Sequence, residues 1–454
     1  MRKILAIIIG KFVSWGLLKF RGHTSFMGGK IALKIDPHLF EKLEKPKKII
    51  TITGTNGKTS VTNILVDIVK ESNLNYIDNR RGANLKTGLV NTLISNSTIT
   101  GHTNADIGIF EVDERVSPLV YSNLKPDYLI LTNLVRDSMK RNANTDYISY
   151  ILEGSIPEKT KILVNGDDII ASSVTKNEKL FYGIDRLESD KETPFNIVRD
   201  IVVDEKTLKP LEYEFVRMNH QGRLDNTKNE TIHSPELDYR VTNIDKEKNI
   251  ISIYFKKENK IFDFNIIQET LFNIYNELAA IVGAYNLGID IETIQKAVKN
   301  IKITGSRYEE YPLINNKKLI KNLAKGQNPI ACSTVFKSVK DDLGTKKIIL
   351  HLSDRFDNIE GSETVMWLYE LDFEFLNDEN IKEIYVIPPR EKDINARLLL
   401  AGIDESKINI LNSYEEVANI NINDVEKIYI LNDMYVEDEA QKMKQIILDK
   451  YKKI

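Results

Sequence analysis

The sequence of 454 residues contains one cysteine, Cys332, which excludes an internal disulfide and a metal site built from several thiolates. An excess of charge of one sign is also lacking, since 63 Lys and Arg stand against 66 Asp and Glu. This balance excludes binding of nucleic acid through a strongly basic surface. The apolar share of 42% is that of an ordinary globular chain. We therefore expect an intracellular, cytoplasmic protein of about three domains at ~150 residues each.

Long hydrophobic runs are absent as well. The most apolar stretch, residues 4–20, is interrupted by Lys11 and Lys19, and it is shorter than the roughly 20 residues that a spanning helix needs. No small-residue cleavage site follows it. The stretch predicts an amphipathic or buried helix within an N-terminal helical segment (1–46). A helix lying on the membrane surface is the alternative, and peripheral contact with the inner face of the membrane stays open.

From Lys47 onward, short β-rich runs alternate with amphipathic helical stretches. The strand-like runs are 47–53, 107–113, 127–132, 161–164 and 179–183, with a helix predicted at 58–70. Because strands separated by helices pair in parallel and carry helices on both faces, we predict an α/β central domain over 47–304. Short alternating runs such as 239–244 and 250–255 predict a β-rich insertion at about 186–260.

A helix predicted at 272–288 ends at Gly288, and Asp290 is the expected N-cap of the next helix. A second alternating series follows, with strands at 318–324, 346–354, 381–389, 407–411 and 426–433. This series predicts a smaller, doubly wound α/β domain over 305–454.

A phosphate-binding loop is the sharpest motif. It reads Thr53-Gly54-Thr55-Asn56-Gly57-Lys58-Thr59 between a predicted strand and a predicted helix. Glycines let the backbone N–H groups face phosphate oxygens, while Lys58 reaches the outer phosphates and Thr59 can bind Mg²⁺. The generic motif has glycine where this chain has Ile52, and the alternative is an ordinary strand–turn–helix junction. The required strand and helix are both present, so we predict nucleotide binding.

Carboxylates follow the second long strand of this domain. Glu111, Asp113 and Glu114 stand at its C-terminal end, where open α/β sheets bind their ligands. A carboxylate there can hold Mg²⁺. Glu111 is the predicted functional residue, whereas a functional role and a solvated acidic turn are equally compatible with Asp113 and Glu114.

The loop resembles that of the Mur ligase superfamily, whose members use ATP to activate a carboxylate as an acyl phosphate and couple it to an amine. Three further segments resemble the family in order: Thr132-Asn133 with Asp137, Asn273-Ile-Tyr-Asn276 leading into Ala279-Ala280, and Ser306-Arg307-Tyr-Glu309. The resemblance implies that Asn276 and Arg307 contact the nucleotide.

Within that superfamily, the chain is most similar to the MurT family, the ligase subunits of lipid II isoglutaminyl synthase. The similar segments are Gly29-Lys-Ile-Ala-Leu-Lys-Ile-Asp36, Arg81-Gly-Ala-Asn84, Asn165-Gly-Asp-Asp168, Asn322-Leu-Ala-Lys325 with Asn328-Pro329, and Trp367-Leu-Tyr-Glu-Leu-Asp-Phe-Glu374. The resemblance implies ATP, Mg²⁺, a lipid II substrate and a GatD-like glutamine amidotransferase partner that supplies ammonia. The acceptor is then the D-glutamate α-carboxylate, and the product is D-isoglutamine.

Two departures from the MurT pattern bear on function. The family's insertion commonly carries a four-cysteine zinc ribbon, whose positions here fall near Asp204, Thr207, Thr227 and Glu230, so we predict no zinc. The family also supplies a C-terminal aspartate that completes the partner's Cys-His pair, and Glu363 lies nearest that place. Asp357 and Glu360 are rivals, and a plain acidic loop is the alternative.

Two other functions remain as alternatives. One is a Mur-like amino-acid ligase of the folylpolyglutamate synthase type, which would consume an amino acid rather than ammonia. The other is a non-catalytic paralogue that binds nucleotide and acts as a scaffold, for which Lys58 would be dispensable.

Overall fold

The computed structural model describes residues 1–21, 26–80, 84–137, 144–301, 308–324, 328–353 and 365–451. The chain forms two compact units. The first comprises Met1–Val135, Thr145–Pro194 and Ile201–Lys302; the second comprises Arg136–Asn144, Phe195–Asp200 and Ile303–Ile454. The expected boundary between residues 304 and 305 lies outside the described residues.

The first unit is built on a nine-stranded sheet in the order β11-β10-β9-β6-β5-β4-β1-β3-β2. Its strands are β1 (Lys48–Thr53), β2 (Tyr76–Asp78), β3 (Ile107–Glu111), β4 (Tyr128–Leu131), β5 (Lys161–Asn165), β6 (Lys179–Ile184), β9 (Tyr239–Asp245), β10 (Ile250–Phe255) and β11 (Lys260–Asn265). The strands from β2 to β9 are parallel, and β10 and β11 add antiparallel pairs. The predicted α/β fold class is confirmed.

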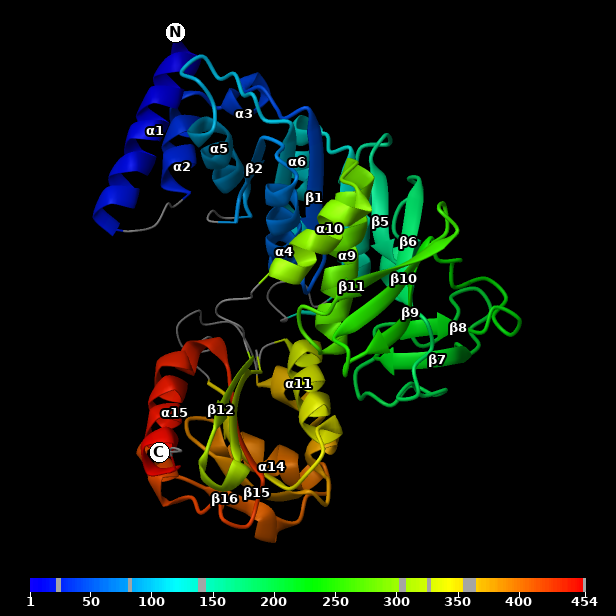
Figure 1. Ribbon diagram of the computed structural model, residues 1–454, viewed down its shortest axis with the longest axis vertical. Coiled ribbons are helices and arrows are strands. Elements are labelled where there is room, and N and C mark those ends of the chain that lie inside the picture. The colour runs from blue at the N-terminus through cyan, green and yellow to red at the C-terminus, as the bar shows by residue number, and fades with distance from the viewer. Residues whose placement is uncertain are drawn as a thin grey trace. The chain divides into compact units, whose positions relative to one another are not determined.

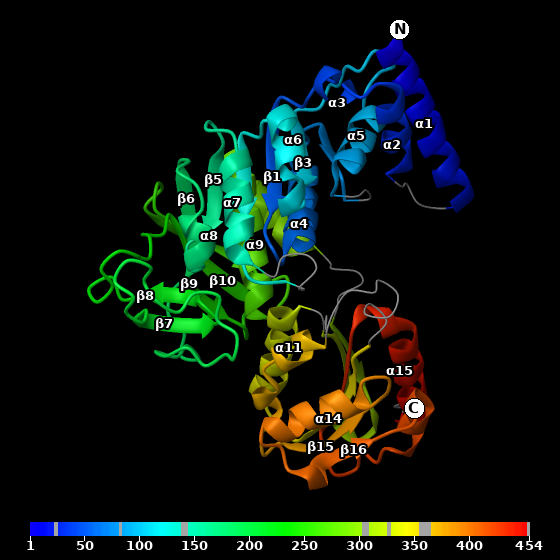
Figure 2. The same cartoon turned by 180° about the vertical axis from the view of Figure 1, so that it is seen from behind.

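Helices cover both faces of this sheet because its central strands are apolar on both sides. On β1, Ile50 and Ile52 belong to one core and Ile49 to the other. One face carries α4 (Lys58–Glu71), α9 (Leu271–Leu287) and α10 (Ile291–Asn300) (Figure 1). The other core contains α6 (Ser117–Leu124), α7 (Thr145–Ser155) and α8 (Ile169–Ser173) (Figure 2), with α1 (Arg2–Arg21), α2 (Met27–Ile35), α3 (Leu39–Lys42) and α5 (Lys86–Ser95).

The predicted ends of α9 and α10 are confirmed. Gly288 ends α9 with φ 94°, a left-handed conformation that favours glycine. The Asp290 carboxylate caps α10 by accepting a hydrogen bond from Thr293 N at 2.8 Å.

The segment predicted as a β-rich insertion divides into two parts. β7 (Tyr213–Met218) and β8 (Gln221–Leu224) form a separate antiparallel pair. The runs at 239–244 and 250–255 are strands, as predicted, but they extend the main sheet as β9 and β10. Alternation of residues indicates a strand without saying which sheet the strand joins.

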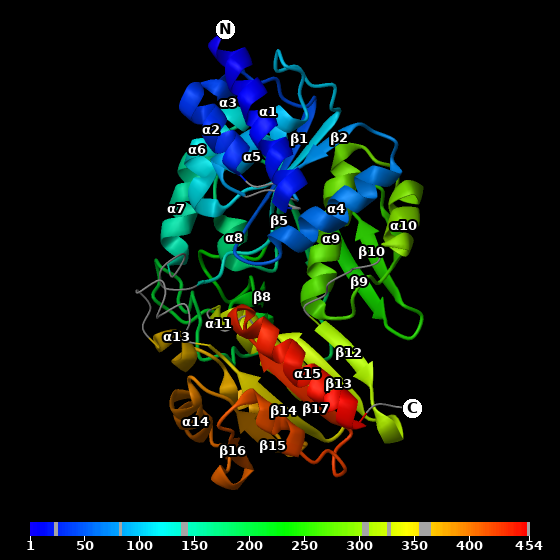
Figure 3. The same cartoon turned by 90° about the vertical axis from the view of Figure 1, so that its left-hand side faces the viewer.

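The second unit has a six-stranded sheet in the order β12-β13-β17-β14-β15-β16. Its strands are β12 (Tyr308–Pro312), β13 (Lys318–Leu323), β14 (Lys346–His351), β15 (Ile381–Val386), β16 (Ile408–Ile410) and β17 (Lys427–Asn432). All neighbours are parallel except β12. The helices are α11 (Pro329–Asp341), α13 (Met366–Tyr369), α14 (Glu391–Leu400) and α15 (Glu437–Tyr451), and Figure 3 shows α15 lying across β13 and β17.

Short 3₁₀ helices complete the described structure: η1 (Glu114–Val116), η2 (Ile314–Asn316), η3 (Phe373–Leu376), η4 (Glu405–Lys407), η5 (Tyr414–Asn419) and η6 (Met434–Val436). Within the described ranges, every helix is too short or too polar to cross a membrane.

Candidate nucleotide site

The phosphate loop joins β1 to α4 and requires its two glycines. Gly54 has φ 126° and Gly57 has φ 89°, both in the left-handed region. A Cβ atom on Gly57 would lie 2.2 Å from Asn276 Oδ1, and one on Gly54 would lie 2.2 Å from Thr132 Oγ1. The loop therefore packs directly against two of the other motifs that the sequence singled out.

Thr132 and Asn133, which follow β4, hold the loop from one side. Asn133 Oδ1 accepts a hydrogen bond from Asn56 N at 3.0 Å, and Thr55 N donates to Asn133 O at 2.9 Å. Thr132 Oγ1 donates to Asn56 O at 2.7 Å. These bonds fix the loop's backbone before any ligand binds.

Lys58, at the start of α4, lies inside the loop with Glu114. Its Nζ is 2.8 Å from Glu114 Oε1 and also donates to Gly54 O. Glu114 Oε1 accepts a second hydrogen bond from Gly54 N at 3.0 Å. Burial alone lowers the pKa of Lys58, but the nearby carboxylates of Glu114, Asp113 and Glu111, with Glu114 the strongest of them, together raise the pKa above its usual range. Glu114, which the sequence left open, is the carboxylate that keeps Lys58 charged.

Thr59 and Glu111 meet at the C-terminal ends of β1 and β3. Thr59 Oγ1 donates to Glu111 Oε2 at 2.9 Å, and Asn84 Nδ2 donates to Glu111 Oε1 at 3.2 Å. Asn79 Nδ2 donates to Glu111 O, and Glu111 N donates to Asn79 Oδ1, each at 2.8 Å. One hydroxyl and one carboxylate suit Mg²⁺, which keeps several waters and takes few protein ligands.

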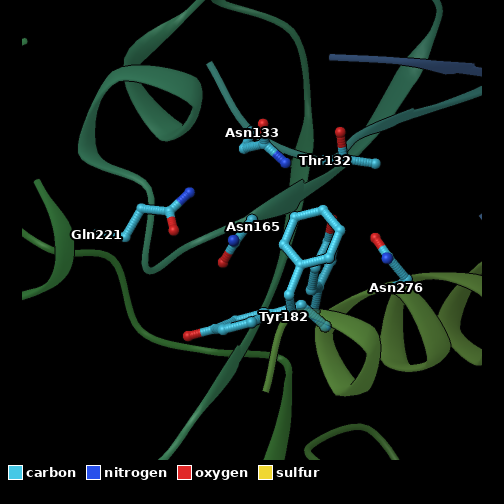
Figure 4. Close-up of a pocket in the computed structure, with 8 residues that line it drawn as sticks. Thr132, Asn133, Asn165, Tyr182, Gln221 and Asn276 are labelled. Carbon is cyan, nitrogen blue, oxygen red and sulfur yellow. The ribbon is translucent and has the colours of Figure 1, made fainter. Parts of the chain in front are cut away.

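A pocket opens beside the loop. It is lined by Thr132, Asn133, Asn165, Tyr182, Gln221, Phe272, Tyr275 and Asn276. Figure 4 shows Asn276 of α9 and Thr132 near each other at the pocket's edge, with Gln221 across from them. Asn276 is 3% exposed, and within the described residues its Nδ2 has no hydrogen-bond partner. A buried amide donor without a partner beside a phosphate loop fits a nucleotide ligand.

A buried ion-pair network supports the pocket wall. Arg217 of β7 lies 2.8 Å from Asp167 and 3.1 Å from Asp190. Tyr275 OH donates to Asp167 Oδ2 at 2.5 Å. Arg217 thus connects the insertion hairpin to α9, one residue before Asn276. Sequence reasoning missed this network because its members are distant along the chain: Asp167 and Tyr275 lay in two separate recognised segments, and Arg217 and Asp190 lay in none.

Two predicted site residues, Arg307 and Glu363, lie outside the described residues, as do the rivals Asp357 and Glu360. Their roles stay predictions. Among the described residues, no three His, Cys, Asp or Glu side chains gather as a metal-binding cluster.

Hydrogen-bonded turns occupy the places where the zinc ribbon's cysteines were expected. Asp204 Oδ1 accepts from Lys206 N at 3.0 Å and Thr207 N at 3.1 Å. Its other oxygen accepts from Thr231 N at 3.1 Å and from the Thr231 hydroxyl, and Lys209 pairs with Glu230 at 2.6 Å. One carboxylate therefore joins the two turns of the insertion.

The Trp367–Glu374 segment fastens distant parts of the chain within the second unit. Asp372 accepts hydrogen bonds from Ile197 N at 2.7 Å and Asn196 Nδ2 at 2.9 Å. Glu370 lies 3.0 Å from Arg136, which also pairs with Asp200 at 2.7 Å. The carboxylates of this segment thus hold Arg136 and residues 196–200 in the unit.

Comparisons with known proteins agree with these features. The family model of the Mur ligase middle domain matches residues 52–229, and that of the MurT ligase C-terminal domain matches residues 325–435. The lipid II isoglutaminyl synthase (glutamine-hydrolyzing) subunit MurT of Staphylococcus aureus (strain COL) is 27% identical over 417 residues, 89% of each chain. The protein of the same name from Streptococcus pneumoniae (strain ATCC BAA-255 / R6) is 28% identical over 440 residues, 95% of this chain and 94% of that one.

Solved structures show the same fold. A pseudomurein peptide ligase type C from Methanothermus fervidus superposes with a TM-score of 0.64 and 18% identity, covering 90% of this chain and 81% of that one. MurF from Acinetobacter baumannii superposes with a TM-score of 0.60 and 11% identity, covering 94% and 80%.

The sheet, the phosphate loop and the matched middle domain define an ATP-dependent ligase of the Mur family. The C-terminal match and the two full-length relatives narrow the class further. The chain belongs to the MurT family of these ligases.

Proposed function

We propose that the chain is the ligase subunit of a glutamine-dependent enzyme that amidates the D-glutamate α-carboxylate of the lipid II stem peptide. The observation that carries the proposal is the loop itself. Lys58, Thr59 and Glu111 converge at one sheet edge in a chain whose C-terminal part matches the MurT family model. The names of the MurT relatives supply the reaction and the lipid II substrate.

The reaction has two steps. An oxygen of the substrate carboxylate attacks the γ-phosphorus of ATP, the bond from that phosphorus to the bridging oxygen breaks, and ADP leaves. The nitrogen of ammonia then attacks the acyl carbon, the bond to the phosphate oxygen breaks, and phosphate leaves as the nitrogen gives up a proton. The product is an amide.

The chain's own residues serve the first step. Lys58, kept charged by Glu114, stabilises negative charge on the transferring phosphoryl group. The loop's N–H groups bind phosphate oxygens, and Asn276 offers its amide donor to the nucleotide. Thr59 and Glu111 would hold Mg²⁺, which neutralises phosphate charge when bound.

Ammonia comes from a GatD-like glutaminase in this proposal. Glu363 would complete the partner's Cys-His pair by orienting the imidazole. Among Asp357, Glu360 and Glu363, only the change Glu363→Gln is then expected to abolish glutamine-dependent turnover and leave turnover with free ammonia intact. Asp357→Asn and Glu360→Gln serve as its controls.

The test measures amidation of lipid II by the chain with its coexpressed partner, ATP, Mg²⁺ and glutamine, using mass spectrometry of the released peptide. Lys58→Ala is expected to lower the rate by about 10²–10³-fold, the usual effect of removing one transition-state donor. Lys70→Ala, exposed on the same helix, is the matched control and keeps the rate. Chelation of Mg²⁺ is expected to stop turnover.

Three results would contradict the proposal. One is the absence of product with a folded, active partner. Another is consumption of a free amino acid in place of ammonia, which would indicate an amino-acid ligase. The third is an unchanged cellular phenotype for Lys58→Ala, which would indicate a scaffold.

A further inference from the structure

Helix α1 packs closely on the first unit through its inner face. A Cβ atom on Gly28 of α2 would lie 2.6 Å from Gly10 O, so the backbones of α1 and α2 touch at this crossing. Ser14 Oγ donates to Asn91 Oδ1 of α5 at 2.7 Å. Figures 1 and 2 show α1 as the outermost helix of this unit, with α2 and α5 on its inner side.

The opposite side of α1 is also apolar, and it is exposed. Leu5, Ile8, Phe12 and Trp15 are 52%, 45%, 69% and 52% exposed. Their spacing of three, four and seven residues places them on one side of the helix, which we call the α1 outer face. A helix that is apolar on all sides is normally buried on all sides, so we expect another surface to cover the α1 outer face.

Charge in this part of the chain has one sign. The first 35 residues contain seven of the 63 basic residues and none of the 66 acidic ones, so the remainder of the chain is net acidic. Lys19 stands on the α1 outer face with its Nζ 5.1 Å from the centre of the Trp15 ring, and the Phe12 and Trp15 rings are 6.0 Å apart. Exposed aromatic rings among lysines, without acids, are typical of helices that lie in a lipid interface.

We propose that the α1 outer face docks the protein on an anionic lipid bilayer. The helix lies in the plane of the surface, with its aromatic side chains at the level of the headgroups and its basic residues near lipid phosphates. Spanning is excluded for this helix, as reported above. The inference deepens the proposed function, on which it rests for the lipid-linked substrate that would lie in the same surface.

The test is flotation of the full chain with vesicles, in the absence of ATP, substrate and partner. Binding is expected to phosphatidylglycerol vesicles, to weaken as salt rises, and to be lost with neutral phosphatidylcholine. Trp15 reports insertion by a blue shift of its fluorescence, because the other tryptophan, Trp367, is 1% exposed.

Two variants locate the contact. Phe12→Glu and Lys19→Glu are each expected to reduce the bound fraction at least about tenfold, since one removes apolar contact and the other reverses a charge. Leu343→Glu, an equally drastic change at a residue 84% exposed in the second unit, is the control and binds normally. Thermal melting verifies that each variant is folded, as expected because all three substituted positions are exposed.

The proposal is overturned if the unmodified chain does not float, or if Phe12→Glu floats like it. It is also overturned if light scattering shows a dimer that Phe12→Glu dissociates, because the α1 outer face would then be a self-interface. If the chain fails to float but still amidates detergent-solubilised lipid II, the docking proposal is wrong and the proposed function is retained. If the chain binds vesicles but does not amidate lipid II, the docking proposal is retained and the proposed function is wrong.

Discussion

Gly57 is one of two sterically constrained glycines in the phosphate loop. Its φ of 89° is unfavourable for any residue with a Cβ, and that atom would meet Asn276 Oδ1 at 2.2 Å. Gly57→Ala is expected to displace Asn276 and lower the affinity for a non-hydrolysable ATP analogue about tenfold or more. Isothermal titration calorimetry measures this change.

The control for that change is Gly154→Ala on α7. A Cβ there meets nothing within 4 Å, so the variant keeps the nucleotide affinity and gains about 0.5 kcal/mol of stability from helix propensity. Equal affinities for the two variants would contradict contact between the loop and Asn276 as the reason for the glycine.

At the scale of single residues, the sequence predicted the residues of the phosphate loop. It did not predict which of several neighbouring side chains makes a given contact. Lys58 and Thr59 follow from a motif whose geometry is set within a few residues. Which of three nearby carboxylates reaches Lys58 depends on how β3 turns into η1, and Glu114 proved to be the one. Asn84 was part of a recognised segment, but its bond to Glu111 depends on how the residues before α5 pack beside the end of β3.

Helix α9 carries a buried acid, Glu277, next to Asn276. Glu277 Oε2 accepts from Ile267 N at 3.0 Å, and burial raises the pKa of Glu277 to about 8. Between the ordinary pKa of 4.5 and about 8, the folded chain holds a proton that the unfolded chain releases. The stability contributed by the neutral acid is therefore lost as pH rises through this window.

Urea unfolding at several pH values tests this behaviour. Relative to Glu277→Gln, which is neutral at every pH, the unmodified chain is expected to lose on the order of 3 kcal/mol from about pH 5 to about pH 9. Glu292→Gln, exposed on α10, should follow the unmodified chain instead. A constant difference between the unmodified chain and Glu277→Gln would mean that Glu277 is charged in the folded state.

The insertion is held by hydrogen bonds at the places where cysteines were expected. Asp204 joins the turn at 204–207 to Thr231, and those bonds hold the pKa of its carboxyl well below the usual range. Asp204→Ala is expected to accelerate proteolytic cleavage between residues 204 and 231 without moving the main thermal transition. Asp245→Ala is the control, because the Asp245 carboxylate bonds to Lys248 within the β9–β10 turn.

Cleavage of the Asp204→Ala chain at the unmodified rate would contradict this role. Sequence comparison could locate the missing cysteines but not their replacement, since a carboxylate that accepts backbone N–H groups has no spacing rule of its own. The same limit explains why β9 and β10 were predicted as strands and yet assigned to the insertion.

At the scale of the whole molecule, the chain passes between its two units at five points. Alternating strands and helices predicted both sheets, because that pattern is local. It could not indicate that Arg136 and residues 195–200 belong to the second unit. That arrangement depends on carboxylates at Glu370 and Asp372, which lie in a recognised segment but whose bonding partners are distant along the chain.

The distribution of charge along the chain gives the last prediction. If the basic, apolar α1 outer face holds the enzyme on a lipid surface, Phe12→Glu should raise KM for lipid II in anionic vesicles about tenfold or more, because a variant that leaves the surface no longer meets the substrate at a raised local concentration. The kcat should stay unchanged, since Phe12 is 69% exposed on α1, whereas the phosphate loop joins β1 to α4. A water-soluble stem peptide should be amidated equally by both chains, with Leu343→Glu as control. A fall in kcat on both substrates would mean that α1 acts on the site through the fold rather than through the membrane.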